Sequence, residues 1–553
     1  MDIAAVAIIT AAENFLFRQW QNTTIGNLTT GNVLTLFLVQ YVLLKYYRLV
    51  LYPNYFSPLR HLPGPSGGHL FLGQTVNILR AETPVTLFNE WMHKWPDAPF
   101  IRYLGVGNQE FLLPNSPAAY KAVLQTHCYS FRKPDWFIRM TKEVIGKGLL
   151  SLEGEAHRSN RKMMNVPFAA SNICKLEPLF KEKARGIGSV FDSAIRAGDD
   201  EGKTGVIECI ETFSKATLDI MGVSILGKEL SHLNTVRYKG KDTLKKSTEE
   251  EYSFAQAYHI FFAPGPVGKL LTYFNGFIPL RWLPLEANRE FKFAMWWLNN
   301  TLARVRRERF GEIEAAKAQG TYESSNSRDL TTFMVEESLP GGSITGLSEE
   351  VFVGHLLQFM AAGHDTSANV LSWSLLIMAE HQNIQQSLRN EMLDLFRATP
   401  DPTYSQIDGL TYLENFIKET LRVYSPATTY HKQSDKDLII EGHLIPKGTC
   451  FDIAPSMAMF NPLIWGQDSH EVKPDRWNHL TAEQSNPFAF GAFSNGPRIC
   501  IGKAFAMMEI KTILIELVRN YRFLKVEKSY TVENPNLTLR PAGLEIRLER
   551  IEQ

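Results

Sequence analysis

A single cysteine at the predicted start of a helix constrains this 553-residue chain more than any other feature. Residues 493–502 read FSNGPRICIG and a helical pattern follows over 503–517, so Cys500 is expected near a helix N-terminus. The partial positive charge and free N–H groups there lower the pKa of a thiol. Gly496 lets the backbone approach a bulky, flat group, and Arg498 offers a planar fork for a carboxylate. Such a thiolate is a nucleophile or a metal ligand, and no clear Cys–His protease signature accompanies it.

The composition excludes several classes of protein. Lys and Arg number 58, as do Asp and Glu, and this balance gives no basic footprint for nucleic acid. Hydrophobic residues make up 44% and charged residues 21%, which is ordinary globular usage and not that of a disordered chain. The five cysteines include no C-x-x-C pair, so a structural zinc site, an iron–sulfur cluster and a disulfide framework are not expected.

An apolar segment near the N-terminus, residues 33–52, has the length of a bilayer span, about 20 residues. Lys45 and Arg48 lie toward one end, where their stems can snorkel to the headgroups. The alternative is a buried amphipathic helix. Lys45, Arg48 and Arg60 lie toward the C-terminal side of the segment, whereas only Arg18 precedes it. The positive-inside rule therefore predicts that the C-terminal bulk of the chain faces the cytosol. Because a shorter apolar run covers 3–12, the sequence leaves open whether the chain spans the membrane once or twice.

Two sequons, at Asn22 and Asn27, would then lie on the lumenal side as candidate glycosylation sites. A Pro- and Gly-rich stretch over 62–68 follows the span and marks the start of a new unit. We therefore expect a lumenal segment and membrane anchor over 1–58 and one large domain over 59–553.

The large domain is predicted to be mainly helical with a small sheet. Its longest helix covers 348–380, with Ser348 as N-cap. Aromatic residues and prolines crowd 260–284, which is either a core loop or an apolar surface that dips into the membrane. Further expected helices cover 384–396 and 410–424, and expected strands cover 99–104, 109–113, 437–445, 449–453 and 543–549.

The run F-x-x-G-x-R-x-C-x-G, from Phe493 to Gly502, resembles the heme-binding loop of the cytochrome P450 family, the heme-thiolate monooxygenases. Glu419 and Arg422 resemble the E-x-x-R motif of that family, and residues at i and i+3 share one helix face. The resemblance implies a buried ion-pair network with Arg476 in the sequence PDRW, in which loss of one partner leaves an unpaired charge.

Residues 362–366, AGHDT, resemble the oxygen-activation motif of the family. Gly363 removes a side chain where a ligand can sit, and a threonine hydroxyl can bond back to the carbonyl four residues earlier and open the helix. The resemblance implies that Thr366 and Asp365 deliver protons during oxygen activation.

The resemblance also implies a bound heme b with Cys500 as the proximal iron ligand. Arg161 matches an arginine that pairs with a heme propionate, and His157 stands where tryptophan is usual. Lys432 falls where many members carry a propionate arginine, but it is a point charge and not a fork. The implied cofactor-binding residues are Cys500, Arg498, Arg161, His157, Lys432, Phe493 and Gly496.

The fold implied is the mainly α cytochrome P450 fold, with small β-sheets and an N-terminal anchor in the endoplasmic reticulum membrane. The implied reaction inserts one oxygen atom from O2 into a hydrophobic small molecule, such as a terpenoid or polyketide of fungal secondary metabolism. No flavin or nicotinamide fingerprint occurs, so the expected electron donor is a separate NADPH–cytochrome P450 reductase, with cytochrome b5 as a further candidate. The substrate-pocket residues carried over are Trp136, Phe137, Phe359, Ala362, Ala427, Thr428 and Leu537, whose alternative role is simple core packing.

Two other functions stay open at this point. The same fold can serve a heme-thiolate isomerase or dehydratase that needs no reductase, or a non-enzymatic heme-binding sensor. Neither needs the acid–threonine pair, and Asp365 and Thr366 are both present, which favours the monooxygenase.

Overall fold

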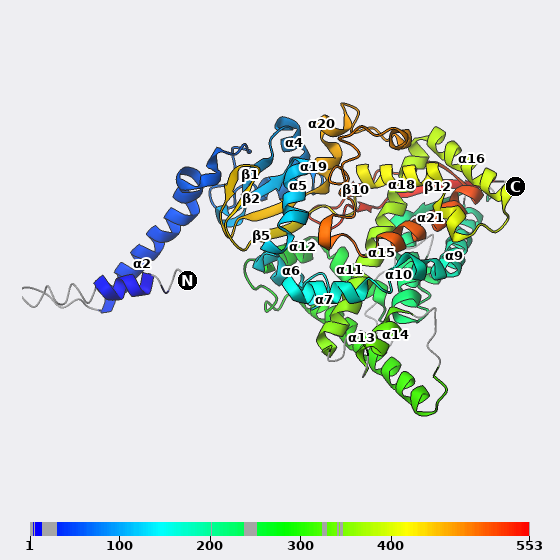
Figure 1. The fold of residues 1–553 in the computed structure, drawn as a ribbon, viewed down its shortest axis with the longest axis horizontal. Helices are drawn as coiled ribbons and strands as arrows, with labels where there is room; N and C mark the ends of the chain where they lie inside the picture. The colour runs from blue at the N-terminus through cyan, green and yellow to red at the C-terminus, as the bar shows by residue number, and fades with distance from the viewer. Residues whose placement is uncertain are drawn as a thin grey trace, which may run out of the picture.

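The computed structural model describes residues 30–551 except 199, 201, 237–251, 323–328, 340, 341 and 343–346, together with residues 4 and 6–13. The predicted sequons at Asn22 and Asn27 lie outside the described residues. The chain is mainly helical with small β-sheets, which confirms the predicted fold class (Figure 1).

The α-helices are α2 (Thr30–Tyr46), α3 (Thr75–Arg80), α4 (Thr86–Lys94), α5 (Pro117–Lys121), α6 (Asp135–Ile145), α7 (Gly154–Met164), α8 (Ala170–Ile173), α9 (Glu177–Arg196), α10 (Cys209–Met221), α11 (Phe254–Phe262), α12 (Gly265–Asn275), α13 (Glu286–Ala318), α14 (Leu330–Ser338), α15 (Glu349–Glu380), α16 (Gln382–Ala398), α17 (Tyr404–Asp408), α18 (Thr411–Val423), α19 (Pro455–Phe460), α20 (Pro462–Trp465) and α21 (Lys503–Asn520). The strands are β1 (Phe100–Leu104), β2 (Glu110–Pro114), β3 (Phe131–Arg132), β4 (Thr204–Glu208), β5 (Tyr430–Ser434), β6 (Leu438–Ile440), β7 (His443–Ile445), β8 (Cys450–Ile453), β9 (Tyr521–Val526), β10 (Thr531–Val532), β11 (Pro541–Ala542) and β12 (Glu545–Arg550).

The largest sheet has the strand order β1-β2-β8-β5-β3, and β4-β12-β9 form a second sheet. The predicted single strand over 437–445 is wrong, because the segment is a hairpin of β6 and β7. Glu441 and Gly442 both have positive φ, 49° and 76°, which is the backbone of a tight hairpin turn.

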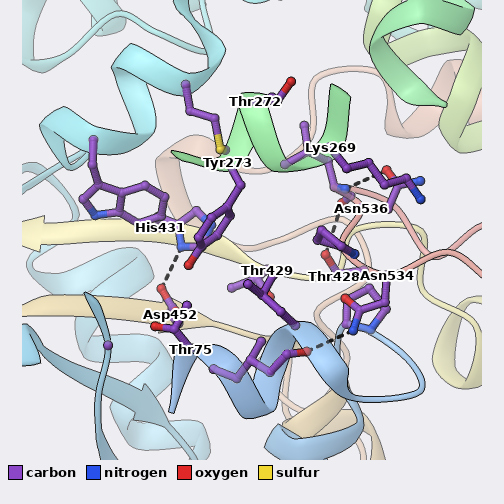
Figure 2. Close-up of a pocket in the computed structure, with 18 of the residues that line it drawn as sticks. Thr75, Lys269, Thr272, Tyr273, Thr428, Thr429, His431, Asp452, Asn534 and Asn536 are labelled. Atoms are coloured by element: carbon purple, nitrogen blue, oxygen red, sulfur yellow. Dashed lines mark hydrogen bonds and ion pairs between the residues drawn. The ribbon is translucent and has the colours of Figure 1, made fainter. Parts of the chain in front are cut away.

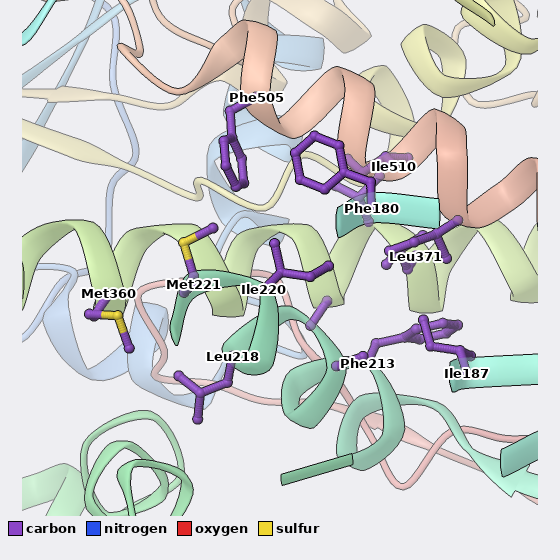
Figure 3. Close-up of a cluster of buried hydrophobic side chains, with 14 of the residues drawn as sticks. Phe180, Ile187, Phe213, Leu218, Ile220, Met221, Met360, Leu371, Phe505 and Ile510 are labelled. Carbon is purple, nitrogen blue, oxygen red and sulfur yellow. The ribbon is translucent and has the colours of Figure 1, made fainter. Parts of the chain in front are cut away.

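Helix α15 forms the centre of the core. Its N-cap is the predicted Ser348, whose hydroxyl accepts from the backbone N–H of Val351 at 3.3 Å. Most of its side chains are buried around the whole circumference, as expected of a helix enclosed by others. Phe180, Phe213, Met221, Leu371 and Phe505 come from α9, α10, α15 and α21 and pack in one cluster around it (Figure 3).

The N-terminal helix stands apart from this core. Among the described residues, Val33–Phe56 form the one helix that is long and apolar enough to cross a membrane. None of the residues in its apolar 18-residue stretch is buried. Its second half, Tyr47–Phe56, is a π-helix. Figure 1 shows α2 projecting from the end of the body that carries β1 and β2.

The segment over 260–284 has both a buried and an exposed part. Phe261 and Phe262 are buried at the end of α11, as a core segment requires. Four large apolar side chains that follow them are exposed, namely Val267, Leu270, Ile278 and Trp282.

We predict that Gly354→Ala destabilises the protein, because α15 crosses residues 146–148 at backbone contact. A Cβ on Gly354 would lie 2.7 Å from backbone atoms of Lys147 and 2.9 Å from the nitrogen of Gly148. We expect the free energy of unfolding to fall by about 1–3 kcal/mol, the usual cost of overpacking. Denaturant unfolding followed by fluorescence measures it.

The matched control is Gly311→Ala in α13, where nothing lies within 4 Å of the added Cβ. Because alanine is the better helix former, this variant should gain up to about 1 kcal/mol. Equal stability of the two variants would contradict the close crossing.

Candidate active site

The loop that carries Cys500 is held by contacts at both ends. The backbone N–H of Cys500 donates to the carbonyl of Phe493 at 2.8 Å. Nη1 of Arg161, on α7, donates to the carbonyl of Ile499 at 2.6 Å. Gly496 has a φ of 71°, and a Cβ there would lie 2.2 Å from the carbonyl oxygen of Leu124, so only glycine fits. The loop geometry is therefore fixed by the fold itself.

The prediction of a lowered thiol pKa is wrong for the protein alone. Desolvation by the surrounding protein raises the pKa of the Cys500 thiol, and the backbone N–H of Gly502 and the charge of Arg161 only partly oppose it. Cys500 is nevertheless solvent-accessible. A bound metal cation deprotonates such a thiol outright.

Positive charge is concentrated beside this loop. Burial and then four neighbouring cations lower the pKa of His157 to about 3, so its ring is neutral. One ring nitrogen of His157 lies 3.2 Å from the hydroxyl of Tyr129. The four cations are Arg498, Lys133, Arg161 and Lys432. The sequence analysis missed Lys133, because nothing in its neighbourhood marks it as part of this cluster.

The carboxylate of Glu153 balances two of these charges. It accepts from Nζ of Lys133 at 2.9 Å and forms a close ion pair with Arg498. Lys432 is 8% exposed and has no ion-pair partner in the described part of the chain. Nε of Arg498 is likewise buried without a hydrogen-bond partner there. The site therefore holds more positive than negative charge, and some of its hydrogen-bond donors have no acceptor.

These residues fit heme b. The group brings two propionate carboxylates, which match the surplus cations, and an iron atom that takes a thiolate ligand. Cys500 would hold the iron, and Arg161, Lys432, Arg498 and Lys133 would surround the carboxylates.

The AGHDT segment of α15 presents one face that the protein does not cover. Ala362 is exposed and Thr366 is half-buried, although most of the helix is buried. Oγ1 of Thr366 donates to the carbonyl of Ala362 at 2.7 Å, as the sequence predicted. Gly363 has a different role from the one predicted, because its Cβ position points at Met221, whose sulfur lies 2.2 Å away. It allows α10 to pack against α15.

Asp365 is buried and turned into the protein. Its carboxylate accepts from Nη1 of Arg540 at 3.1 Å, Oγ1 of Thr538 at 2.7 Å and Nδ2 of Asn369 at 3.1 Å. These contacts tie α15 to the C-terminal segment. Sequence analysis missed Arg540 and Thr538 as partners, because they lie more than 170 residues away and no local pattern links them.

The ion pairs expected around Arg422 are present. Arg422 is fully buried and donates to both carboxylate oxygens of Glu419 at 2.9 Å. Its other bonds go to the carbonyls of Met459, Ser469 and Glu471. The chain over 459–471 is thereby fixed against α18.

Glu419 also binds the segment after this stretch. It accepts from Nε of Arg476 at 2.8 Å and from Nε1 of Trp477 at 2.9 Å. Burial tends to raise the pKa of Glu419, but the hydrogen bond and charge of Arg422 outweigh it and hold the pKa below its ordinary value.

A second buried carboxyl joins α15 to α21. Oγ of Ser367 donates to Glu509 at 2.6 Å, and the other carboxyl oxygen of Glu509 is buried without a partner in the described chain. Burial raises the pKa of Glu509 to about 8, so the group is protonated at neutral pH. The sequence analysis did not single it out, since an isolated glutamate in a helix carries no signal.

A cavity of about 190 Å³ lies between the largest sheet, α6, α11 and α12 (Figure 2). Of the predicted pocket residues, Trp136, Thr428 and Leu537 line it. Phe137 packs on the ring of His431 with centroids 5.0 Å apart, and Phe359 packs on Phe168 in the core.

Ala362 and Ala427 are not among the residues that line this cavity. Ala362 lies on the exposed face of α15, and Ala427 forms a β-bridge with Thr538. Four of the seven predicted pocket residues are therefore absent from its lining.

The sequence profile of the cytochrome P450 family matches residues 63–548 of the chain. This protein belongs to the cytochrome P450 family. Named relatives are similar along most of their length. Cytochrome P450 monooxygenase sphH of Aspergillus fumigatus is 28% identical, over 86% of this chain and 85% of that protein. Cytochrome P450 monooxygenase FUM15 of Gibberella moniliformis is 28% identical, over 91% and 90%. Cytochrome P450 monooxygenase ALT8 of Alternaria alternata is 26% identical, over 91% and 92%.

The family identifies the chain as a heme-thiolate monooxygenase that binds heme b. Enzymes of this kind generally take electrons from redox partners and act on hydrophobic substrates. The resemblance noted in the sequence is thereby confirmed for the family, the fold and the class of reaction.

We predict that Arg422→Met strongly destabilises this P450, because it leaves the carboxylate of Glu419 buried beside fewer partners. The free energy of unfolding should fall by about 3–5 kcal/mol, the cost of breaking a buried ion pair. Denaturant unfolding of the heme-loaded protein measures the loss.

The control is Arg397→Met, which removes an ion pair of the same spacing with Asp394 on the surface, where both side chains are 76% exposed. Its cost should be at most about 1 kcal/mol. Similar losses in the two variants would show that burial of Arg422 carries no special weight.

Proposed function

We propose that this P450 receives electrons from NADPH–cytochrome P450 reductase, with cytochrome b5 as a second donor. It inserts one oxygen atom into a hydrophobic secondary metabolite, such as a terpenoid or polyketide. The observation that carries the proposal is the accessible Cys500 thiol beside four cations and one carboxylate. The mostly apolar walls of the cavity support a hydrophobic substrate.

The bound heme would supply the oxidising chemistry, which a thiolate ligand favours by donating electron density to the iron. The protein holds the group in place with charge. Arg161, Arg498, Lys432 and Lys133 would neutralise the carboxylates, and Glu153 keeps the guanidinium of Arg498 oriented. His157 is neutral and can donate one ring N–H to a carboxylate.

Thr366 would orient the proton donor. Because its own proton is held by the carbonyl of Ala362, its oxygen is free to accept a hydrogen bond at the exposed face of α15. Asp365 can pass a proton to this face once its carboxylate turns away from Arg540 and takes up a proton from water. We propose this rotation as the route by which protons from solvent reach Thr366.

Reconstitution with a reductase tests the proposal. NADPH- and O2-dependent product formation should require the reductase and disappear in Cys500→Ala. In Thr366→Ala, product should fall by roughly a hundredfold, the lower range for a positioned proton-transfer group, while NADPH consumption continues. Thr366→Ser keeps the hydroxyl and should retain coupling. Turnover that survives without a reductase would favour the isomerase or dehydratase.

We further propose that Val33–Phe56 anchors this P450 in the endoplasmic reticulum membrane, with the heme domain in the cytosol. The exposed side chains Val267, Leu270, Ile278 and Trp282 would add a second, shallow contact with the lipid. They lie close in sequence to Phe261 and Phe262, which line the cavity. This contact would therefore place the cavity near apolar substrates that are dissolved in the membrane.

Truncation tests the anchor. A chain lacking residues 1–46 loses most of the apolar helix but keeps Leu49, whose carbonyl accepts from Asn108. We expect alkaline washing to release this variant from microsomes while the full chain remains. The double variant Leu270→Ser with Trp282→Ser in the full chain should stay membrane-bound. Release of the full chain by the same wash would exclude a span.

A further inference from the structure

One wall of the cavity carries a buried carboxylate. Asp452 on β8 is 4% exposed and receives hydrogen bonds from two neighbours. Nδ1 of His431 lies 2.7 Å from Oδ1 of Asp452, and the hydroxyl of Tyr103 forms a close contact with Oδ2. His431 and Asp452 are direct partners in the pairing of β5 with β8. Figure 2 shows this pair on the cavity wall beside Tyr273.

The partners of Asp452 determine what His431 offers to a ligand. A carboxylate accepts only, so Nδ1 carries a proton and donates it to Asp452. Nε2 is then the free end of the ring, and no hydrogen bond from the described part of the chain reaches it. Trp136 and Phe137 pack on the ring at centroid distances of 4.7 and 5.0 Å and fix its plane.

The remaining charges near the cavity are already neutralised. Lys269 pairs with Glu533 at 3.2 Å. Arg132, on β3 next to β5, pairs with Asp135 and Asp435. The hydroxyl of Tyr103 is used by Asp452, and burial together with that carboxylate raises the pKa of Tyr103 well above its ordinary value, so the phenol stays protonated. Nε2 of His431 is thus an oriented polar atom with an unused bonding position, and Nε1 of Trp136 on the same cavity is a second one among the described residues.

The pair leaves one polar atom for whatever fills the cavity. A buried carboxylate must be satisfied by hydrogen bonds, and His431 and Tyr103 satisfy Asp452. The His431 side chain is 15% exposed, so Nε2 can exchange a hydrogen bond with water for one with a ligand.

We propose that Nε2 of His431 binds an oxygen function of the substrate, so that this P450 acts on an apolar skeleton that already carries a hydroxyl or carboxyl group. This inference rests on the proposed function, since it assigns the substrate class of the same site. The protonated ring donates to a carboxylate, and the neutral ring accepts from a hydroxyl. An earlier oxidation or hydrolysis must therefore install the oxygen function before this enzyme acts.

Ligand titration of the heme-loaded full-length protein tests the inference without turnover. The probes are adamantane, adamantanol and adamantanecarboxylic acid, which share one compact apolar skeleton, and the readout is the ligand-induced change in heme absorption. We expect Kd for at least one oxygenated probe to be about tenfold lower than for adamantane, the factor one net hydrogen bond supplies. Comparison of adamantanol with adamantanecarboxylic acid shows whether the site prefers a hydroxyl or a carboxylate.

His431→Phe should bring the oxygenated probes to the Kd of adamantane, whose own Kd should change less than about threefold because no hydrogen bond is lost. Asp452→Asn should weaken the preference, because the amide no longer fixes the ring. His443→Phe, on β7 and away from the cavity lining, is the matched control and should keep the wild-type preference.

Equal Kd values for the three probes in the wild type would overturn the inference, as would a preference that survives in His431→Phe. The wild-type comparison needs no variant, so it stands even if a substitution prevents folding. If Cys500→Ala leaves the carbon monoxide band of the reduced protein unchanged, the proposed function fails instead, because another ligand then holds the iron.

Discussion

The burial of one arginine determines the path of the chain that leads to the catalytic cysteine. A guanidinium removed from water is tolerated only when its donors are satisfied, and Arg422 is fully buried. Glu419 and the carbonyls over 459–471 supply the acceptors, so this stretch can take only one course. Arg476 then returns to Glu419 and fixes the start of the segment that ends at Cys500. The position of the thiol therefore depends on an ion pair within α18, remote from Cys500 in the sequence.

The parts of the site that the sequence predicted well are those whose chemistry is complete within a few residues. The back-bond of Thr366 to Ala362 and the pair of Glu419 with Arg422 span four and three positions. The positive φ of Gly496 is also a local feature, although its close approach to the carbonyl oxygen of Leu124 joins distant parts of the chain. Helix α15 was predictable for a related reason, since a long apolar stretch after an N-cap leaves few alternatives.

The contacts that could not be predicted join residues far apart in the chain. Arg540 holds Asp365, and Glu153 holds Arg498, through side chains that look like ordinary surface charges in the sequence. The error on the pKa of Cys500 has the same origin. A helix N-terminus is a local feature and lowers the pKa of a thiol, whereas desolvation comes from the whole surrounding fold and is larger here. Only the assembled structure shows which effect prevails.

Strand β5 presents neighbouring residues to the cation cluster beside Cys500 and to the cavity. Consecutive residues of a strand point to opposite faces, so His431 and Lys432 serve different neighbours. Lys432 is buried within reach of the charges of Arg498 and Glu153, and His431 faces the cavity with Asp452. A slip of one residue would move both side chains to the opposite face of the sheet. Pairing with β3 and β8 prevents that slip, so the sheet itself fixes where Nε2 of His431, the proposed contact for an oxygen function, lies relative to the cation cluster. Changes in the apolar walls can then alter which skeleton fits without moving that reference point.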